Sequence, residues 1–275
     1  MRPRLAGCAL AALLFAVAGS VQAAPRVVGG IDIRVGIAPW SANVQQTVPG
    51  KFRAECGGTI VDALHVLTAA HCVYGLDGNP APPQTFSIRA GISNTYGPLS
   101  TDAEQDRSVV SVDVHPDYVW TSRSIAADDV AMLTLNKPID LSGPDVRAVA
   151  LARSGAPLPV GAHVWLAGFG LHETDIPSDG TLELINQTVI SRAACQSAAA
   201  RFTIEGDVAA LCARAPHTAT CRGDSGSGLV AVSRPRVLVG IVSAGSDNCV
   251  PGSVGLFTYV GAPVIRRFIA SALRH

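Results

Sequence analysis

The stretch Cys221-Arg222-Gly223-Asp224-Ser225-Gly226-Ser227-Gly228 carries the strongest signal in this chain of 275 residues. A serine hydroxyl becomes a nucleophile when a base removes its proton, and the developing oxyanion needs nearby N–H donors. Glycines beside Ser225 permit the tight turn that directs successive amides at one point. The stretch is not the Gly-x-Ser-x-Gly elbow of α/β-hydrolases, because Ser227 stands in place of the last glycine. Taken alone, it is also compatible with an ordinary turn.

Two further stretches supply the partners that such a serine needs. Val66-Leu67-Thr68-Ala69-Ala70-His71-Cys72 places a histidine at the end of an apolar run, where it can act as a general base. Asp128-Asp129-Val130-Ala131-Met132-Leu133 places carboxylates at the mouth of another apolar run. A carboxylate there can accept the histidine N–H and hold its tautomer. Alone, the histidine could be structural and the carboxylate a residue of the turn that starts a strand.

Composition favours an all-β fold. Hydrophobic residues make up 48% of the chain and the formal net charge is zero, which excludes disorder and argues against a nucleic-acid partner. The 27 glycines and 18 prolines favour many turns and strands. Short apolar runs between turn residues predict strands at 61–69, 86–88, 109–114, 130–135, 163–167, 229–232 and 237–242. Only 263–273 has helical spacing, which predicts a terminal helix.

Residues 1–23 have the pattern of a secretory signal peptide. Arg2 and Arg4 precede an apolar stretch that ends in small residues, which favours cleavage after Ala23. An N-terminal membrane anchor is the alternative, but the stretch is short and is diluted by glycine and serine. Removal of the signal takes Cys8 away and leaves six of the seven cysteines, which export predicts to be disulfide-bonded. The mature protein is therefore expected to be secreted, with no membrane anchor.

The order His71, Asp129, Ser225, with these local sequences, resembles that of the chymotrypsin-like (trypsin family) serine proteases. The resemblance runs from Val27 to the terminal helix. Further matching motifs are Arg26-Val27-Val28-Gly29-Gly30, Cys56-Gly57-Gly58-Thr59-Ile60, His115-Pro116-Asp117-Tyr118, Gly168-Phe169-Gly170, Ser243-Ala244-Gly245, Cys249 and Gly255-Leu256-Phe257-Thr258. The resemblance implies two six-stranded antiparallel β-barrels, expected over 27–145 and 146–275, with the site in the cleft between them.

The resemblance also implies a serine endopeptidase that works through an acyl-enzyme, without a metal or a cofactor. Ser225 would be the nucleophile, His71 the base and then the acid, and Asp129 the residue that orients His71. Asp128 is the alternative carboxylate. The backbone N–H groups of Gly223 and Ser225 would form the oxyanion hole.

The family's pattern implies three disulfides, although the cysteines by themselves leave the pairing open. The expected pairs are Cys56–Cys72, Cys195–Cys212 and Cys221–Cys249. A zinc site is the alternative use of these cysteines, but no Cys-x-x-Cys spacing supports it.

Activation by cleavage is a further implication of the resemblance. Residues 24–26 would remain as a short propeptide, and a cut after Arg26 would free the amine of Val27. That amine is expected to pair with Asp224 and to order the oxyanion loop. A buried carboxylate without a partner is costly, so the pair can act as a switch. The expected partners of this monomer are a protein or peptide substrate and an activating trypsin-like protease.

Specificity is expected to differ from that of trypsin. In the family, the residue six before the nucleophile lines the base of the primary specificity pocket, and here it is Ala219. An aspartate there would select Arg or Lys, which alanine cannot do. The other expected substrate-binding residues are Thr220, Arg222, Ser243, Ala244, Gly245 and Gly255. The prediction is cleavage after large apolar or aromatic residues. The rival function is a catalytically silent homologue that acts as a binding protein, although such homologues usually lack part of the triad.

Overall fold

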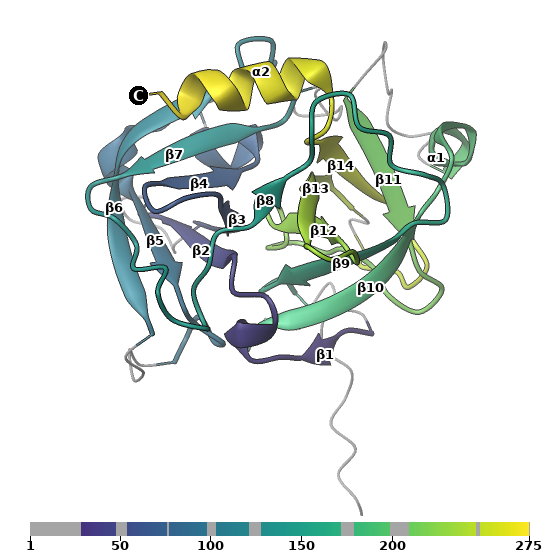
Figure 1. The fold of residues 1–275 in the computed structure, drawn as a ribbon, viewed down its shortest axis with the longest axis horizontal. Helices are drawn as coiled ribbons and strands as arrows, with labels where there is room; N and C mark the ends of the chain where they lie inside the picture. Colours follow the sequence, from purple (N-terminus) through teal and green to yellow (C-terminus); the bar gives the residue numbers. More distant parts are fainter. Residues whose placement is uncertain are drawn as a thin grey trace, which may run out of the picture.

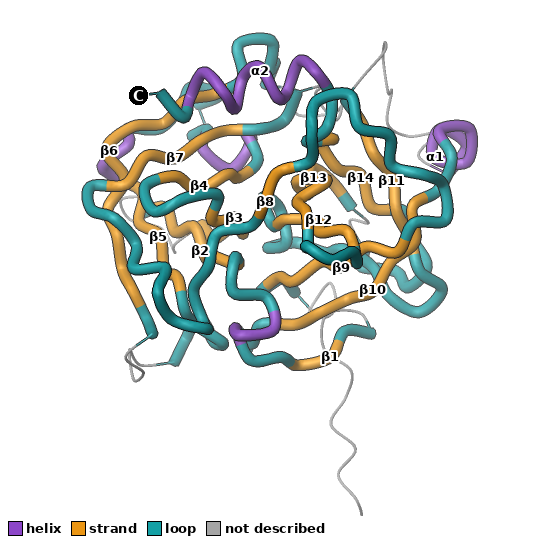
Figure 2. Tube along the Cα trace, in the orientation of Figure 1, coloured by secondary structure: helices purple, strands orange, loops and turns teal. Residues whose placement is uncertain are grey.

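The computed structural model describes residues 29–47, 54–75, 77–97, 103–120, 128–171, 179–198, 209–245 and 248–274. The expected signal peptide, the propeptide and the cleavage site at Arg26 and Val27 lie outside these residues. Two groups of strands lie side by side, and helices are few and short (Figures 1 and 2). In the part of the chain that is described, no helix is both long enough and apolar enough to cross a lipid bilayer.

The first group of strands is a closed antiparallel barrel with the order β2-β3-β4-β7-β6-β5. Its strands are β2 (Ser41–Gln46), β3 (Ala54–Ile60), β4 (His65–Thr68), β5 (Phe86–Ala90), β6 (Gln105–Val114) and β7 (Ala131–Leu135). The strand expected over 61–69 begins only at His65, because Asp62 Oδ1 accepts the N–H groups of Leu64 and His65 and closes a turn. The barrel is filled by Ile60, Ile88 and other fully buried apolar side chains.

The second group also closes into a ring of six antiparallel strands, because β9 pairs with β10. Its strands are β9 (His163–Gly168), β10 (Glu183–Val189), β11 (Ala210–Arg214), β12 (Gly228–Ala231), β13 (Val237–Ala244) and β14 (Gly255–Tyr259). Two short strands extend the sheet: β1 (Ile31–Asp32) pairs with β10, and β8 (Ala150–Leu151) pairs with β13. The predicted fold of two six-stranded antiparallel barrels is confirmed.

The terminal helix α2 (Pro263–Ala272) is also confirmed, and it lies over the first barrel beside β7 (Figure 1). Its buried residues Ile265 and Ile269 belong to the same apolar cluster as Val130 and Met132. The last element of the chain therefore packs where the segment with Asp129 enters β7. The other helical segments in the described residues are α1 (Arg192–Ala198) and the short 3₁₀ turns η1 (Val35–Ile37), η2 (Ala70–Val73) and η3 (Pro83–Thr85).

Candidate active site

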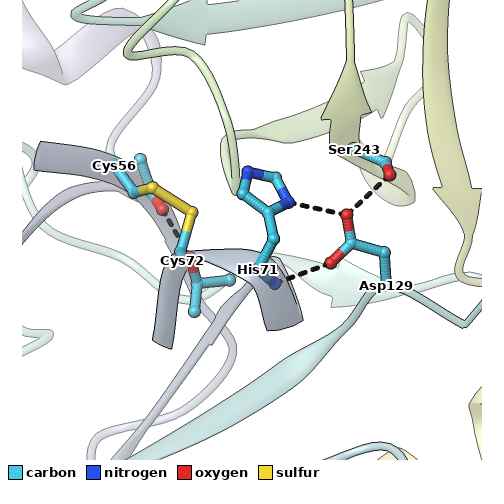
Figure 3. Close-up of a disulfide and its surroundings, with 7 residues drawn as sticks. Cys56, His71, Cys72, Asp129 and Ser243 are labelled. Carbon is cyan, nitrogen blue, oxygen red and sulfur yellow. Dashed lines mark hydrogen bonds and ion pairs between the residues drawn. A yellow bond between two sulfur atoms is a disulfide. The ribbon is translucent and has the colours of Figure 1, made fainter. Parts of the chain in front are cut away.

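His71 lies on the 3₁₀ turn η2, which follows β4 directly. The disulfide Cys56–Cys72 ties this turn to β3 (Figure 3). The His71 side chain is 29% exposed, whereas its neighbours Ala70 and Val73 are fully buried. The turn is thus anchored on both sides of a histidine whose ring still reaches solvent.

Both carboxylate oxygens of Asp129 engage His71, and one of them also accepts a hydrogen bond from the second barrel (Figure 3). The His71 backbone N–H donates to Oδ1 at 2.9 Å, and Nδ1 of the ring lies 2.7 Å from Oδ2. Ser243 of β13 donates its hydroxyl to the same Oδ2 at 2.6 Å. On β14, the Thr258 hydroxyl donates to the backbone carbonyl of Asp129 at 2.8 Å. The carboxylate is therefore fixed by residues of both barrels.

Asp129 and His71 each stabilise the charged form of the other. Burial alone would raise the pKa of Asp129, but the nearby His71 charge and the hydrogen bonds from His71 and Ser243 hold it below its ordinary value. Burial alone would lower the pKa of His71, but the charge and hydrogen bond of Asp129 raise it above its ordinary value. The second ring nitrogen of His71 faces away from Asp129 (Figure 3). It is therefore the nitrogen available to take a proton from a reacting group.

Backbone hydrogen bonds hold the loop that carries Ser225 against β3 and β13. Gly57 of β3 donates its N–H to the Ser225 carbonyl at 2.7 Å, and Gly226 donates to Val242 at 2.9 Å. Gly226 has φ +83° and packs so closely on Thr68 and Gly57 that a Cβ would overlap them. Ser225 itself is partly exposed. Among the described residues no hydrogen bond joins the Ser225 hydroxyl to His71. In many enzymes the distance between nucleophile and base is long when no substrate is bound.

Asp224 directly precedes Ser225 in this loop and is completely buried. It accepts hydrogen bonds from the backbone N–H groups of Gly170 at 3.1 Å and Cys221 at 2.9 Å. Burial raises its pKa to about 6, against these two hydrogen bonds, which favour the charged form. Within the described residues no cationic side chain pairs with it. The predicted partner, the Val27 amine, lies outside them.

The expected specificity residues come together beside this loop. Ala219 is completely buried in a small cluster with Cys221 and Cys249. These two cysteines form one of the expected disulfides, and Cys195 and Cys212 form another. Side chains added at Gly245 or at Gly255 would both meet the Thr220 hydroxyl. That hydroxyl is buried and has no hydrogen-bond partner in the described part of the chain. Of the remaining expected residues, Arg222 is exposed, whereas Ser243 and Ala244 are half-buried.

A buried acidic residue, Glu183, lies within electrostatic reach of Asp224. Glu183 starts β10 opposite Asp32 of β1, and only 1% of it is exposed. Burial, the hydrogen bond with Asp32 and the negative charges of Asp32, Asp224 and Asp179 raise its pKa to about 9. Glu183 therefore carries a proton at neutral pH. A glutamate between two leucines gives no sequence signal for this raised pKa, which depends on the pairing of β10 with β1.

Glu183 makes the stability of the uncleaved chain depend on pH. Its ordinary pKa is 4.5, so between pH 4.5 and pH 9 the folded state keeps a proton that the unfolded chain has lost, and stability falls as the pH rises through that range. We expect Glu183→Gln, which keeps a neutral hydrogen-bonding side chain, to lose less Tm than the wild type between pH 6 and pH 9. Thermal unfolding at both pH values measures this, with Asn186→Asp, an exposed site on the same strand, as the control. An identical Tm loss in Glu183→Gln and wild type would show that Glu183 is not the group responsible.

Comparison with known proteins gives a consistent result. A family model described as Trypsin matches residues 27–265. The CLIP domain-containing serine protease B4 of Anopheles gambiae is 31% identical over 87% of this chain and 69% of its own length. The vitellin-degrading protease of Bombyx mori is 32% identical over 86% of this chain and 82% of its own. Trypsin iota of Drosophila melanogaster is 30% identical over 96% of this chain and 94% of its own length.

Proposed function

Because the chain belongs to the trypsin family and is a serine endopeptidase, we propose that Ser225, His71 and Asp129 are its catalytic triad. The observation that carries this proposal is the hydrogen-bonded line from Ser243 through Asp129 to His71, with the Ser225 loop bound to β3 beside it. Asp128 is the weaker candidate for the carboxylate, because both oxygens that engage His71 belong to Asp129.

In the proposed reaction, Ser225 Oγ attacks the carbonyl carbon of the substrate while His71 takes the hydroxyl proton. The negative oxygen that forms is stabilised by the N–H groups of Gly223 and Ser225. The C–N bond then breaks, His71 passes its proton to the leaving amine, and the acyl group remains on Ser225. Water, deprotonated by His71, attacks the ester and restores the serine hydroxyl. Asp129 stabilises the cationic His71 in both halves and keeps its own negative charge.

We further propose that the protein is secreted and is made as a zymogen cut after Arg26. Three disulfides are typical of an exported protein, in agreement with the signal-like N-terminus. Asp224 supports the activation step, since a completely buried carboxylate held by two backbone N–H groups is suited to a cationic partner. The amine of Val27 supplies that cation after cleavage.

A serine-directed phosphonate tests the catalytic role directly. We expect it to label the protein cleaved after Arg26, because only a deprotonated serine beside oxyanion donors attacks the phosphorus. Ser225→Ala should not be labelled. Labelling is read from the intact mass, with N-terminal sequencing to confirm that Val27 is the first residue. Correctly processed wild type that takes up no label would favour the rival function, a catalytically silent binding protein.

The uncharged Ala219, at the expected base of the specificity pocket, predicts apolar specificity. An arginine placed there would lose its hydration without gaining a carboxylate partner, which is costly. We expect a chromogenic peptide with Phe before the cleaved bond to be cut at least about tenfold faster than the same peptide with Arg. Ala219→Asp is the matched variant and should reverse the preference. Faster cleavage of the Arg peptide by the wild type would contradict the assignment.

This specificity has a consequence for activation. A protease that disfavours Arg should cut poorly after its own Arg26. We therefore propose that a separate, trypsin-like protease activates it.

A further inference from the structure

A second cluster of metal-ligating side chains lies next to the triad and has no part in the proposed mechanism. His115 and Asp117 follow β6, and Asp128 immediately precedes Asp129 at the entrance to β7. Each of the three offers one ligand atom, and these atoms all lie within 4.8 Å of one another. His115 is 2% exposed, Asp128 is half-buried and Asp117 is exposed. A buried nitrogen therefore meets two carboxylates at the surface.

Backbone hydrogen bonds hold these three residues together. The His115 N–H donates to the Val130 carbonyl at 3.1 Å, which ties the end of β6 to the start of β7. Asp128 has φ +61°, a left-handed conformation that is uncommon for residues other than glycine, and its carbonyl accepts the Val130 N–H at 2.8 Å. Strained backbone of this kind is concentrated at functional sites. No hydrogen bond to the Asp128 carboxylate is formed by any residue that the structure describes.

The His115 ring presents a lone pair in this cluster. Its Nδ1 accepts one long hydrogen bond, 3.3 Å, from the Asp117 backbone N–H. A nitrogen that accepts a hydrogen bond from an amide has its lone pair on that side. A metal ion can replace so weak a hydrogen bond, and the carboxylate of the same Asp117 can then bind the ion as well.

The donor set determines which metal fits. Calcium and magnesium prefer oxygen ligands only, whereas an imidazole nitrogen with carboxylate oxygens suits zinc. Zinc bonds of about 2.1 Å in a tetrahedron place ligand atoms about 3.4 Å apart, so modest rotation of the exposed Asp117 closes the site. Two carboxylates also balance the charge of a dication. We propose that His115, Asp117 and Asp128 bind a zinc ion, and that its binding inhibits the protease.

The inhibitory part rests on the proposed function of the triad. Asp128 and Asp129 are neighbours in the chain, so a dication on Asp128 lies close to the carboxylate that stabilises cationic His71. A zinc ion on Asp128 and the cationic ring of His71 repel each other. Even when solvent partly screens it, this repulsion lowers the catalytic rate by at least about tenfold. Zinc should therefore lower kcat more than it raises KM.

Calorimetric titration of zinc chloride into the chain that lacks residues 1–23 and is not cleaved after Arg26 tests binding without requiring any catalysis. We expect one zinc ion per chain in the wild type. Binding should weaken by at least about tenfold in Asp117→Asn and in Asp128→Asn, the latter keeping a residue that tolerates the left-handed backbone. Asp106→Asn, an exposed site on β6, and His71→Ala should bind zinc like the wild type. Absence of binding, unchanged binding in Asp117→Asn, or loss in His71→Ala would overturn the site.

Activity of the cleaved enzyme tests the inhibitory role separately. At the zinc concentration that saturates the calorimetric site, we expect kcat of the wild type to fall by at least about tenfold. Asp117→Asn at that concentration should keep most of the activity that it has without zinc. A wild type that binds zinc at this cluster and works equally well with and without it would overturn the inhibition. An inactive cleaved enzyme would instead refute the proposed function, leaving the calorimetric result intact.

Discussion

Replacing Ser225 with alanine is expected to lower kcat of the cleaved protein by about 10⁵- to 10⁶-fold. Without Oγ there is no acyl-enzyme, and only the oxyanion donors and substrate binding remain to assist attack by water. Steady-state hydrolysis of a chromogenic Phe peptide measures the loss. KM should change little, because the Ser225 side chain is not expected to hold the substrate in the ground state.

Ser227→Ala is the control for this substitution, since Ser227 belongs to the same loop but is buried against Gly57. We expect this variant to keep most of the activity. Loss of activity in Ser227→Ala together with a fully active Ser225→Ala would mean that Ser225 is not the nucleophile.

Asp224→Asn is expected to lower kcat/KM of the cleaved protein by about 10²- to 10³-fold. Removal of one partner from a buried ion pair costs about 3–5 kcal/mol, because the other charge is left buried alone. An asparagine of equal size keeps the packing but gives the Val27 amine no anion. The amine then remains outside, and the loop with Gly223 and Ser225 is not held in place. Peptide hydrolysis by the cleaved variant measures the effect.

The matched control is Asp140→Asn, an exposed carboxylate on the first barrel. It should leave the activity unchanged. N-terminal sequencing must show that both variants begin at Val27, and circular dichroism must show that both are folded. A cleaved and folded Asp224→Asn with wild-type activity would contradict the activation switch.

Much of this site was predictable because the chemistry lies in continuous motifs. His71 follows one apolar run and Asp129 precedes another, and the structure brings their side chains together at 2.7 Å. The disulfide partner Cys72 follows His71 directly, so one motif specifies both the histidine and its anchor. By contrast, the part of Thr258 in holding Asp129 is formed across the two barrels, and nothing local to Thr258 indicates it.

Several strands had no clear sequence signal for physical reasons. The six residues of β2 (Ser41–Gln46) are all buried although four of them are polar, so the segment contains no apolar run that would mark it as a buried strand. The strand β3 (Ala54–Ile60) contains two glycines, which usually weaken a strand, but Gly57 and Gly58 are needed where other chain segments approach closely. Pairing with neighbouring strands, rather than local propensity, determines these elements.

Clusters of distant residues were the least predictable part. The pKa of Glu183 is raised first by burial and then by Asp32 and Asp224, which are far from it in the sequence. His115 and Asp128 belong to separate motifs, and only the pairing of β6 with β7 brings them together. The sequence alone does not show that the side chains of His115 and Asp128 lie close together, because this depends on the register of the strands.

Detection of the acyl-enzyme tests most directly whether Ser225 is the nucleophile. The protein cleaved after Arg26 is mixed with a slowly deacylating aromatic ester, quenched with acid, and digested for mass spectrometry. We predict one acyl group per chain, carried on Ser225, and none in Ser225→Ala. An unmodified Ser225 peptide, or an acyl group on another residue in an actively hydrolysing sample, would contradict it.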